Sequence, residues 1–372
     1  MRLKKSIKRG IAAVTITGIM ASSAMPAFAK DYHIDYGDIK VDQDKVSYTD
    51  KDGTKYDNEK NEDGDITITG KSDENTVSVK DADVTFKDLE IDRSASSTAA
   101  DGAAVSVSGN SSIELDGKNT ISSGMGHAGI EKADDNGTMT IKDDNNVSGS
   151  LTANGGFGGA GIGGGNNADG SDITITGGTI IANGGFGGAG IGGGSSSISG
   201  GGNGSDITIS GGNVTANGGT AGAGIGGGQE GSGSNVTVSG AAQVTTTAGK
   251  SDGFYGAGAT IGNGGNKTPG GELVDGEEIQ ADISRVTTGY IHHIIYEQDG
   301  TTIKREWWEP ERPQPNPENP QPNPEDPNAP AEESNEVDLG TPGLHVETLE
   351  GDLLPFDAQQ QGSTLRVTSN TL

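Results

Sequence analysis

Apolar residues in the middle of the chain alternate with polar ones in short bursts, and glycine separates these bursts. In one stretch of the chain the alternating pairs are Ala160/Ile162, Ile173/Ile175 and Ile180/Ala182. A spacing of two residues places both members of a pair on one face of a short β-strand. Glycine doublets between the pairs supply the positive φ angles that tight corners need. The pattern predicts three short strands and three corners in each unit.

The unit is repeated along the chain. Near-copies of a glycine-rich block carry Asn154, Asn183 and Asn217 at matching places, 29 and 34 residues apart. A block reading Ser-Asp-Ile-Thr-Ile recurs between them, and similar but fainter alternations continue on both sides. Repeats that cannot bury an apolar face alone stack into solenoids. We therefore expect an all-β fold, a right-handed parallel β-helix of about six three-strand coils and about 29 Å in length. A disordered glycine-rich tract is the alternative, but disordered linkers do not keep an alternating register.

Changes in composition divide the chain into segments. A basic start, an apolar stretch and Ala27-Phe28-Ala29 predict a signal peptide that is cleaved after Ala29. Two strand-like runs around Gln298-Asp-Gly300 predict a short C-terminal β-hairpin, and the proline-rich phrase after it predicts an extended linker. The expected segments are a signal peptide (1–29), an acidic N-terminal cap (30–64), the β-helix (65–270), the hairpin segment (271–308), the Pro-rich linker (309–334) and a C-terminal segment that could be a truncated domain (335–372).

Charge and cysteine content narrow the classes of partner and compartment. The net charge is −28, and removing the five basic residues of the leader leaves 20 basic against 53 acidic residues, or −33. Such a chain repels nucleic acid and anionic membrane surfaces, so we expect neither as a partner, and no membrane insertion after signal cleavage. There are no cysteines, so stability must come from repetition and burial. The expected location is extracellular, on or near a bacterial cell surface.

Enzymes built on β-helix scaffolds need basic side chains or paired carboxylates in a groove, and the sequence does not favour either arrangement. A β-eliminating lyase uses a basic side chain, yet no arginine lies between Ser94 and Ser284, and no lysine lies within residues 152–249. A hydrolase needs two carboxylates held about 10 Å apart or less in a groove. The acidic pairs of this chain lie in loops, where solvated carboxylates are more common. We therefore expect a non-catalytic protein, with a polysaccharide lyase or hydrolase as an alternative.

Threonine recurs at one outward-facing strand position in successive coils. Such a flat face of hydroxyl groups can hydrogen-bond to a polysaccharide chain, although threonine is also the common exposed residue of strands. A regular threonine array also occurs in ice-binding solenoids, but the unequal repeat lengths argue against that function. The candidate ligand-binding residues are Thr140, Thr174, Thr208 and Thr237, with Thr176 and Ser210 beside them.

Calcium (Ca²⁺) is the candidate cofactor. Carboxylates in glycine- and asparagine-rich loops offer the oxygen ligands that this hard cation prefers, while an empty solvated loop is the alternative for each one. The candidate metal ligands are Asp134, Asp135, Asp143 and Asp144.

The repeat as a whole is similar to sequences of a known kind. The unit Ala-Asn-Gly-Gly-x-Gly-Gly-Ala-Gly-Ile-Gly-Gly-Gly, followed by Asp-Ile-Thr-Ile-Thr-Gly-Gly, resembles glycine-rich repeats of secreted and surface proteins of Gram-positive Firmicutes. These are described as carbohydrate-binding or adhesin-like β-helix proteins, and the resemblance covers roughly residues 65 to 265. It implies a role in binding a polysaccharide or cell-surface glycan. A purely structural or protein-adhesion rod is the remaining alternative.

Overall fold

The computed structural model describes residues 30–61, 64–98, 101–132, 136–145, 147–195, 200–310, 356–361 and 364–369. The chain forms two compact units, 1–312 and 313–372. In the second unit, strands β28 (Phe356–Gln361) and β29 (Thr364–Ser369) pair in antiparallel fashion. The predicted leader and most of the predicted Pro-rich linker lie outside the described residues. Across the described ranges no helix has the length and apolarity needed to cross a membrane.

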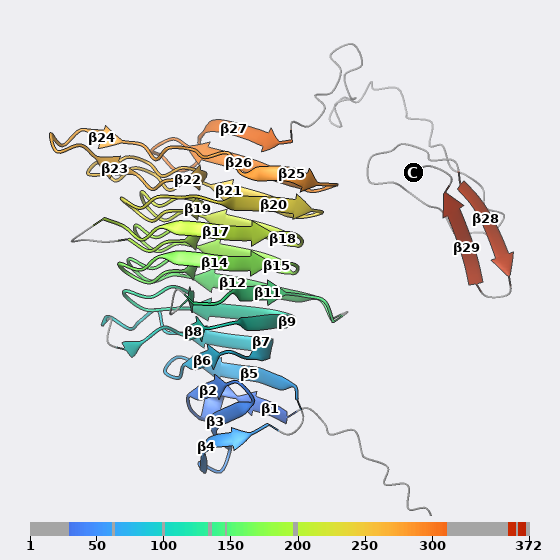
Figure 1. Ribbon diagram of the computed structural model, residues 1–372. Helices are drawn as coiled ribbons and strands as arrows, with labels where there is room; N and C mark the ends of the chain where they lie inside the picture. Colours follow the sequence, from blue (N-terminus) through green and yellow to red (C-terminus); the bar gives the residue numbers. More distant parts are fainter. Residues whose placement is uncertain are drawn as a thin grey trace, which may run out of the picture. The chain divides into compact units, whose positions relative to one another are not determined.

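The first unit is a parallel β-solenoid of about seven turns, which confirms the predicted fold class (Figure 1). Its strands form three faces. The first face contains β11 (Met139–Lys142), β14 (Gly170–Ile175), β17 (Gly204–Ile209), β20 (Val236–Gly240) and β25 (Asp282–Val286). The second face contains β12 (Gly149–Asn154), β15 (Thr179–Asn183), β18 (Asn213–Asn217), β21 (Gln243–Thr247) and β26 (Tyr290–Tyr296).

Shorter strands make the third face, and longer strands serve two faces at once. The third face contains β2 (Ile39–Asp42), β6 (Val77–Lys80), β8 (Val105–Ser108), β10 (Ile130–Lys132), β13 (Ile162–Gly163), β16 (Ile191–Gly192), β19 (Ile225–Gly226) and β22 (Ile261–Gly262). In the N-terminal coils, β5 (Ile66–Ser72), β7 (Asp83–Asp92) and β9 (Ser111–Ser122) run through the first and second faces without interruption. From β11 onward, the first and second faces are built from separate strands.

The core consists of apolar side chains stacked on their equivalents in the next coil. On the first face Met139 pairs with Ile173, which pairs with Ile207. On the third face an isoleucine ladder runs through Ile162 and Ile191. All six residues of the predicted pairs are fully buried, which confirms the period-two pattern; they are Ala160, Ile162, Ile173, Ile175, Ile180 and Ala182. Each buried isoleucine contributes about 1.5–3 kcal/mol relative to exposure.

Glycine lines the third-face ladder because neighbouring backbones approach closely there. Gly163, Gly192, Gly226 and Gly262 are stacked and have φ values of 133°, 132°, 131° and 144°. A Cβ added to Gly192 would overlap the carbonyl oxygen of Gly226 in the next coil. Both the backbone angle and the missing Cβ are therefore required at this ladder, and a larger residue would force the coils apart.

Both ends of the solenoid carry antiparallel strands. At the N-terminal end, β3 (Lys45–Thr49) pairs with β2 and with β4 (Lys55–Lys60). At the C-terminal end, β26 and β27 (Ile303–Glu309) form the predicted hairpin. A small ribbon of β23 (Asn266–Lys267) and β24 (Leu273–Val274) projects beside this end (Figure 1). Antiparallel caps reduce the open strand edges that a solenoid would otherwise present.

The solenoid is longer than the six coils that the repeat predicts. Strand β1 (Lys30–His33) already pairs in parallel with β5, and β2 pairs with β6, so the first coil begins upstream of Asp65. A 3-10 turn at Ile34–Tyr36 joins these strands. At the other end, β25 and β26 extend the first and second faces. These coils escape the sequence pattern because they lack the glycine-rich blocks of the central repeats.

A buried histidine lies at the C-terminal end. The ring of His293 stacks on Trp307 with 4.4 Å between centroids, and its Nδ1 lies 2.7 Å from the Thr260 hydroxyl. The same hydroxyl lies 2.7 Å from a carboxylate oxygen of Glu278. Burial lowers the pKa of His293 to about 4, and the positive charges of His292 and Arg305 act in the same direction. The neutral ring is thus part of the packed end.

We expect replacement of Gly192 by alanine to destabilise the solenoid by several kcal/mol, because an ordinary side chain meets backbone on the next coil. Gly270→Ala is the matched control. Its Cβ would meet only the Thr268 hydroxyl at 3.6 Å, and no positive φ is required there. Urea unfolding followed by circular dichroism measures both variants. Equal stability of the two variants would contradict the account of the glycine ladder.

Acid should weaken the C-terminal end through His293. The unfolded chain takes up the histidine proton near pH 6.5 and the folded chain only near pH 4. Stability therefore falls as pH drops through this window, by on the order of 3 kcal/mol. His293→Gln should flatten the pH dependence of unfolding between pH 6.5 and 4. His33→Gln, at the opposite end of the solenoid, is the control for replacing a histidine as such.

Candidate functional site

The structure places the candidate threonines in one ladder on the first face. Register pairs Thr140 with Thr174, Thr174 with Thr208, and Thr208 with Thr237. Each of the four is half-buried, and they alternate with the fully buried isoleucines and valines of the core. Their hydroxyl groups therefore repeat at the coil spacing of about 4.8 Å. We call these four residues the threonine ladder.

Thr176 and Ser210 continue the first face beyond the ends of β14 and β17. The amide of Thr176 donates to the Ile141 carbonyl at 2.9 Å, and that of Ser210 donates to the Ile175 carbonyl at 2.8 Å. Thr176 is exposed and Ser210 is half-buried. Thr176 and Ser210 thus stand two residues after Thr174 and Thr208, beside the threonine ladder.

Carboxylates continue the threonine ladder at both of its ends. Thr140 pairs with Ser112, and Ser112 pairs with Asp83, whose carboxylate accepts a 2.5 Å hydrogen bond from the Ser112 hydroxyl. At the other end Thr237 pairs with Asp282. Hydrogen bonds from the hydroxyl and the amide of Ser284 lower the pKa of Asp282. The face therefore reads as a row of hydroxyls with an acid beyond each end.

A groove of about 530 Å³ runs beside the threonine ladder. Besides three of the ladder threonines it includes acidic and amide side chains, several of which stand two residues before a ladder threonine. Asp172 and Asp206 occupy equivalent places in successive coils, with φ values of 55° and 54°, and Asn235 follows with 50°. The Asn235 side chain donates to Asp206 at 3.1 Å. The complete lining is Thr138, Asp172, Thr174, Asp206, Thr208, Asn235, Val236, Thr237, Gln280 and Asp282.

The groove is electrostatically one-sided. Asp172, Asp206 and Asp282 contribute carboxylates, and the groove lining contains no lysine, arginine or histidine. Equivalent carboxylates in successive coils raise the local negative potential and attract cations. The groove is therefore suited to bind hydroxyl-rich molecules directly and anionic molecules only with a cation between.

Sequence reasoning missed the acids of this groove, although a signal was present. Asp172 and Asp206 each stand directly before the first isoleucine of their strand, in the recurring Ser-Asp-Ile-Thr-Ile block. Asp and Asn are the non-glycine residues that best tolerate the left-handed region. A repeated Asp before an alternating run therefore indicates a backbone kink that turns a carboxylate outward.

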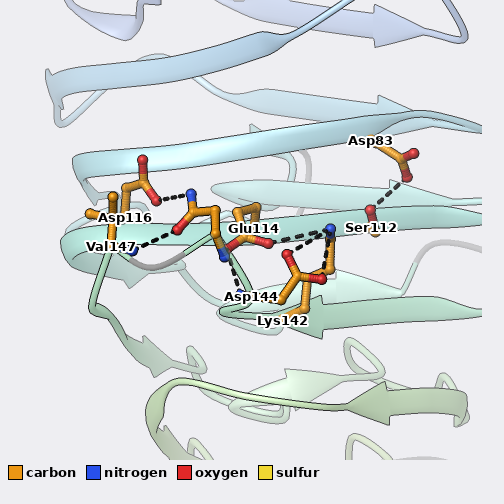
Figure 2. A network of polar contacts seen from close by, with 8 residues as sticks. Asp83, Ser112, Glu114, Asp116, Lys142, Asp144 and Val147 are labelled. Atoms are coloured by element: carbon orange, nitrogen blue, oxygen red, sulfur yellow. Dashed lines mark hydrogen bonds and ion pairs between the residues drawn. The ribbon is translucent and has the colours of Figure 1, made fainter.

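The two described candidate metal ligands lie in a different environment. The Asp143 carboxylate accepts a hydrogen bond from the Gly149 amide at 3.1 Å, and the Asp144 carboxylate lies 3.3 Å from the ammonium group of Lys142. Lys142 also lies 3.3 Å from buried Glu114. Figure 2 shows how Glu114 of β9, Lys142 of β11 and Asp144 of the loop after β11 converge. Asp134 and Asp135 lie outside the described residues.

This cluster closes a loop between the first and second faces. Glu114 accepts hydrogen bonds from the amides of Asp144 and Asn145 at 2.9 and 3.3 Å, and Asn145 donates to Asp116 at 2.6 Å (Figure 2). Burial opposes the charge of Lys142, but hydrogen bonds to Glu114 and Asp144 outweigh it and raise the pKa of Lys142. An ammonium group thus already supplies positive charge beside Asp144.

Among the described residues, the structure contains no preformed set of side-chain ligands for the predicted calcium ion. Within the part of the chain that is described, no three histidine or acidic side chains converge to hold a metal ion. Because calcium takes six to eight oxygen ligands, any ion in the groove would need water or a ligand to complete its shell. The groove lining contains carboxylates but no lysine, whereas Asp144 lies beside the ammonium group of Lys142.

Comparisons with protein-family models, with curated proteins and with solved structures give no match.

Glu114→Gln should destabilise the loop at 143–148, because it weakens two amide hydrogen bonds and leaves Lys142 with only the exposed Asp144. We expect a loss of about 1–3 kcal/mol in the free energy of unfolding. Asp144→Asn, which removes an exposed charge from the same cluster, should change it by about 0.5 kcal/mol or less. Equal effects of both variants in urea unfolding would show that the buried carboxylate is not the anchor.

Proposed function

We propose that this chain is a secreted, non-catalytic carbohydrate-binding or adhesin-like protein, and that the first face contacts a polysaccharide or cell-surface glycan. The observation that carries the proposal is the threonine ladder with the acidic groove beside it. Hydroxyl, amide and carboxylate oxygens repeat there coil after coil. A glycan presents hydroxyl groups along an extended chain, so the two surfaces have matching chemistry over several repeats.

Repetition matters because single contacts are weak. A neutral hydrogen bond contributes about 0.5–1.5 kcal/mol after exchange with water. Useful affinity therefore needs several contacts in a row, which a polymer provides and a monosaccharide does not. The threonine ladder is held by a rigid sheet, so its hydroxyl groups lose little freedom on binding.

Calcium enters the proposal as a bridge. An acidic glycan would be repelled by Asp172, Asp206 and Asp282, and a divalent cation between the two anions would remove that repulsion. The carboxylates of the groove could supply part of the calcium shell, with the glycan and water supplying the rest. Binding of acidic glycans is therefore proposed to require calcium, whereas neutral glycans need none at the same face.

The location and the absence of catalysis are part of the same proposal. The leader-like start supports export, and the acidic charge suits an extracellular protein that meets divalent cations. The groove lining has no basic side chain to abstract a proton from a sugar ring. A carbohydrate contact without bond cleavage is the function that these features favour.

The test removes hydroxyl groups from one face only. The triple variant Thr174→Val, Thr208→Val and Thr237→Val keeps side-chain shape and strand preference but loses three hydroxyls. The matched control is Thr152→Val, Thr215→Val and Thr245→Val, because these threonines occupy one ladder on the second face and are equally half-buried. Retention on immobilised neutral and acidic polysaccharides is measured with calcium and with chelator, together with released sugar.

We expect the first-face variant to lose tenfold or more in affinity, roughly three hydrogen bonds, while the second-face variant binds like the parent protein. Chelation should abolish retention on acidic glycans only. Equal losses in both variants would remove the threonine ladder from the contact. Release of reducing or unsaturated sugars would contradict a non-catalytic role, and retention on no glycan at all would favour a structural rod.

A further inference from the structure

Two phenylalanines are stacked on the outside of the solenoid. Phe157 and Phe186 follow the equivalent Asn-Gly-Gly corners of successive coils, and their rings lie parallel with 5.0 Å between centroids. Phe157 is 55% exposed and Phe186 is 41% exposed. Phenylalanine side chains that served only for packing would be buried. An exposed aromatic pair therefore indicates a binding surface.

The stack covers only one face of the Phe157 ring. Phe186 belongs to the coil that follows Phe157, so the opposite face of Phe157 is turned toward the preceding coils. On that side the Gly126 amide donates to the Phe157 carbonyl, and the Met125 amide donates to the Ser96 carbonyl, which aligns three coils. The opposite side of the ring therefore lies toward the pocket that these coils form, and Met125 holds the equivalent corner position in the preceding coil.

This pocket has a volume of about 680 Å³ and lies between the second and third faces. Its lining combines an aromatic ring and a thioether with hydroxyl and amide groups, and contains no charged side chain. The lining residues are Ser94, Ala95, Ser96, Ser97, Ser122, Ser123, Met125, Asn154, Gly155, Gly156 and Phe157. In a chain of net charge −28, an uncharged pocket is a distinct environment.

A chain of hydrogen bonds leads into the pocket from the neighbouring coils. Asn217 donates to Asn183, and Asn183 donates to Asn154, each at 2.8 Å. Asn154 in turn donates to the Ser122 hydroxyl at 3.0 Å. Among the described residues the Ser122 hydroxyl has no acceptor for its own hydrogen. Chains of this kind polarise their last donor, so Ser122 is a strengthened donor at the pocket wall.

We propose that this pocket binds a single uncharged pyranose residue, whose C–H face stacks on Phe157 and whose hydroxyl accepts from Ser122. A pyranose has one apolar face and a rim of hydroxyls, which matches an aromatic ring flanked by serine and asparagine. A charged sugar would gain no partner there. An apolar peptide side chain would leave the serine hydroxyls without partners on burial.

The proposed sugar pocket is independent of the threonine ladder. It lies at another corner of the solenoid, shares no lining residue with the acidic groove, and uses no carboxylate that calcium could bind. Its occupation should therefore be insensitive to chelators. It also holds if the first face binds nothing.

The experiment measures binding of methyl glycosides of glucose, galactose and mannose, and of their trisaccharides, to the protein in the presence of chelator. Saturation-transfer NMR detects such weak contacts, with dissociation constants on the order of 1 mM. The variants are Phe157→Ala, which removes the ring, and Ser122→Ala, which removes one hydroxyl. Phe254→Ala is the control, because Phe254 is a more exposed phenylalanine that does not line the pocket.

We expect at least one glycoside to bind, Phe157→Ala to abolish its signal, and Ser122→Ala to weaken binding by about fivefold. Phe254→Ala and the first-face threonine variant should bind normally, which separates this proposal from the first. Circular dichroism of each variant checks the fold. The proposal is overturned if no glycoside binds or if binding survives in Phe157→Ala. It is also overturned if the pocket binds only an apolar peptide probe such as N-acetylphenylalanine amide.

Discussion

The close approach of successive backbones in the stack is the constraint on which the rest of this molecule depends. Successive coils hydrogen-bond to one another, and at several ladders the distance between them leaves no room for a Cβ. Gly192 shows this most directly, because its neighbours above and below are also glycines with the same backbone angle. The glycine content is therefore a requirement of stacking and not a sign of a flexible chain.

Exact stacking also turns each outward residue into a row. One threonine per coil becomes the threonine ladder, one asparagine per coil becomes a chain of amide hydrogen bonds, and one phenylalanine in two coils becomes a stacked pair. A globular protein has to assemble such surfaces from distant segments. Here a repeated residue is enough, which explains how a chain with only 4% aromatic residues can still present an organised aromatic surface.

The sequence predicts features that depend on local spacing and fails where they depend on contacts between coils. The buried alternation and the threonine ladder follow from a period of two, so both could be predicted. The carboxylates of Asp172 and Asp206 were missed, because their direction depends on a left-handed backbone angle that only the recurrence of Asp before the alternating run indicates. The terminal coils were not predicted, because β1 and β25 carry no glycine-rich block. These two strands are recognised only by their parallel pairing with β5 and β20. The Lys142 cluster joins residues about 30 positions apart, which no local pattern reveals.

The two proposed contact surfaces differ in charge, and this difference follows from where they lie in the coil. The acidic groove forms where the chain enters the first face, at a kink that favours Asp or Asn, and Asp172 and Asp206 place negative charge there in two successive coils. The pocket at Phe157 forms after the second face, where the central coils carry Asn-Gly-Gly, and its lining contains no charged side chain. The two corners of the central coils thus differ in charge, because the groove lining contains aspartates and the pocket lining contains none. A glycan that carries acidic and neutral residues could then meet each kind of residue on a different edge of the same rod.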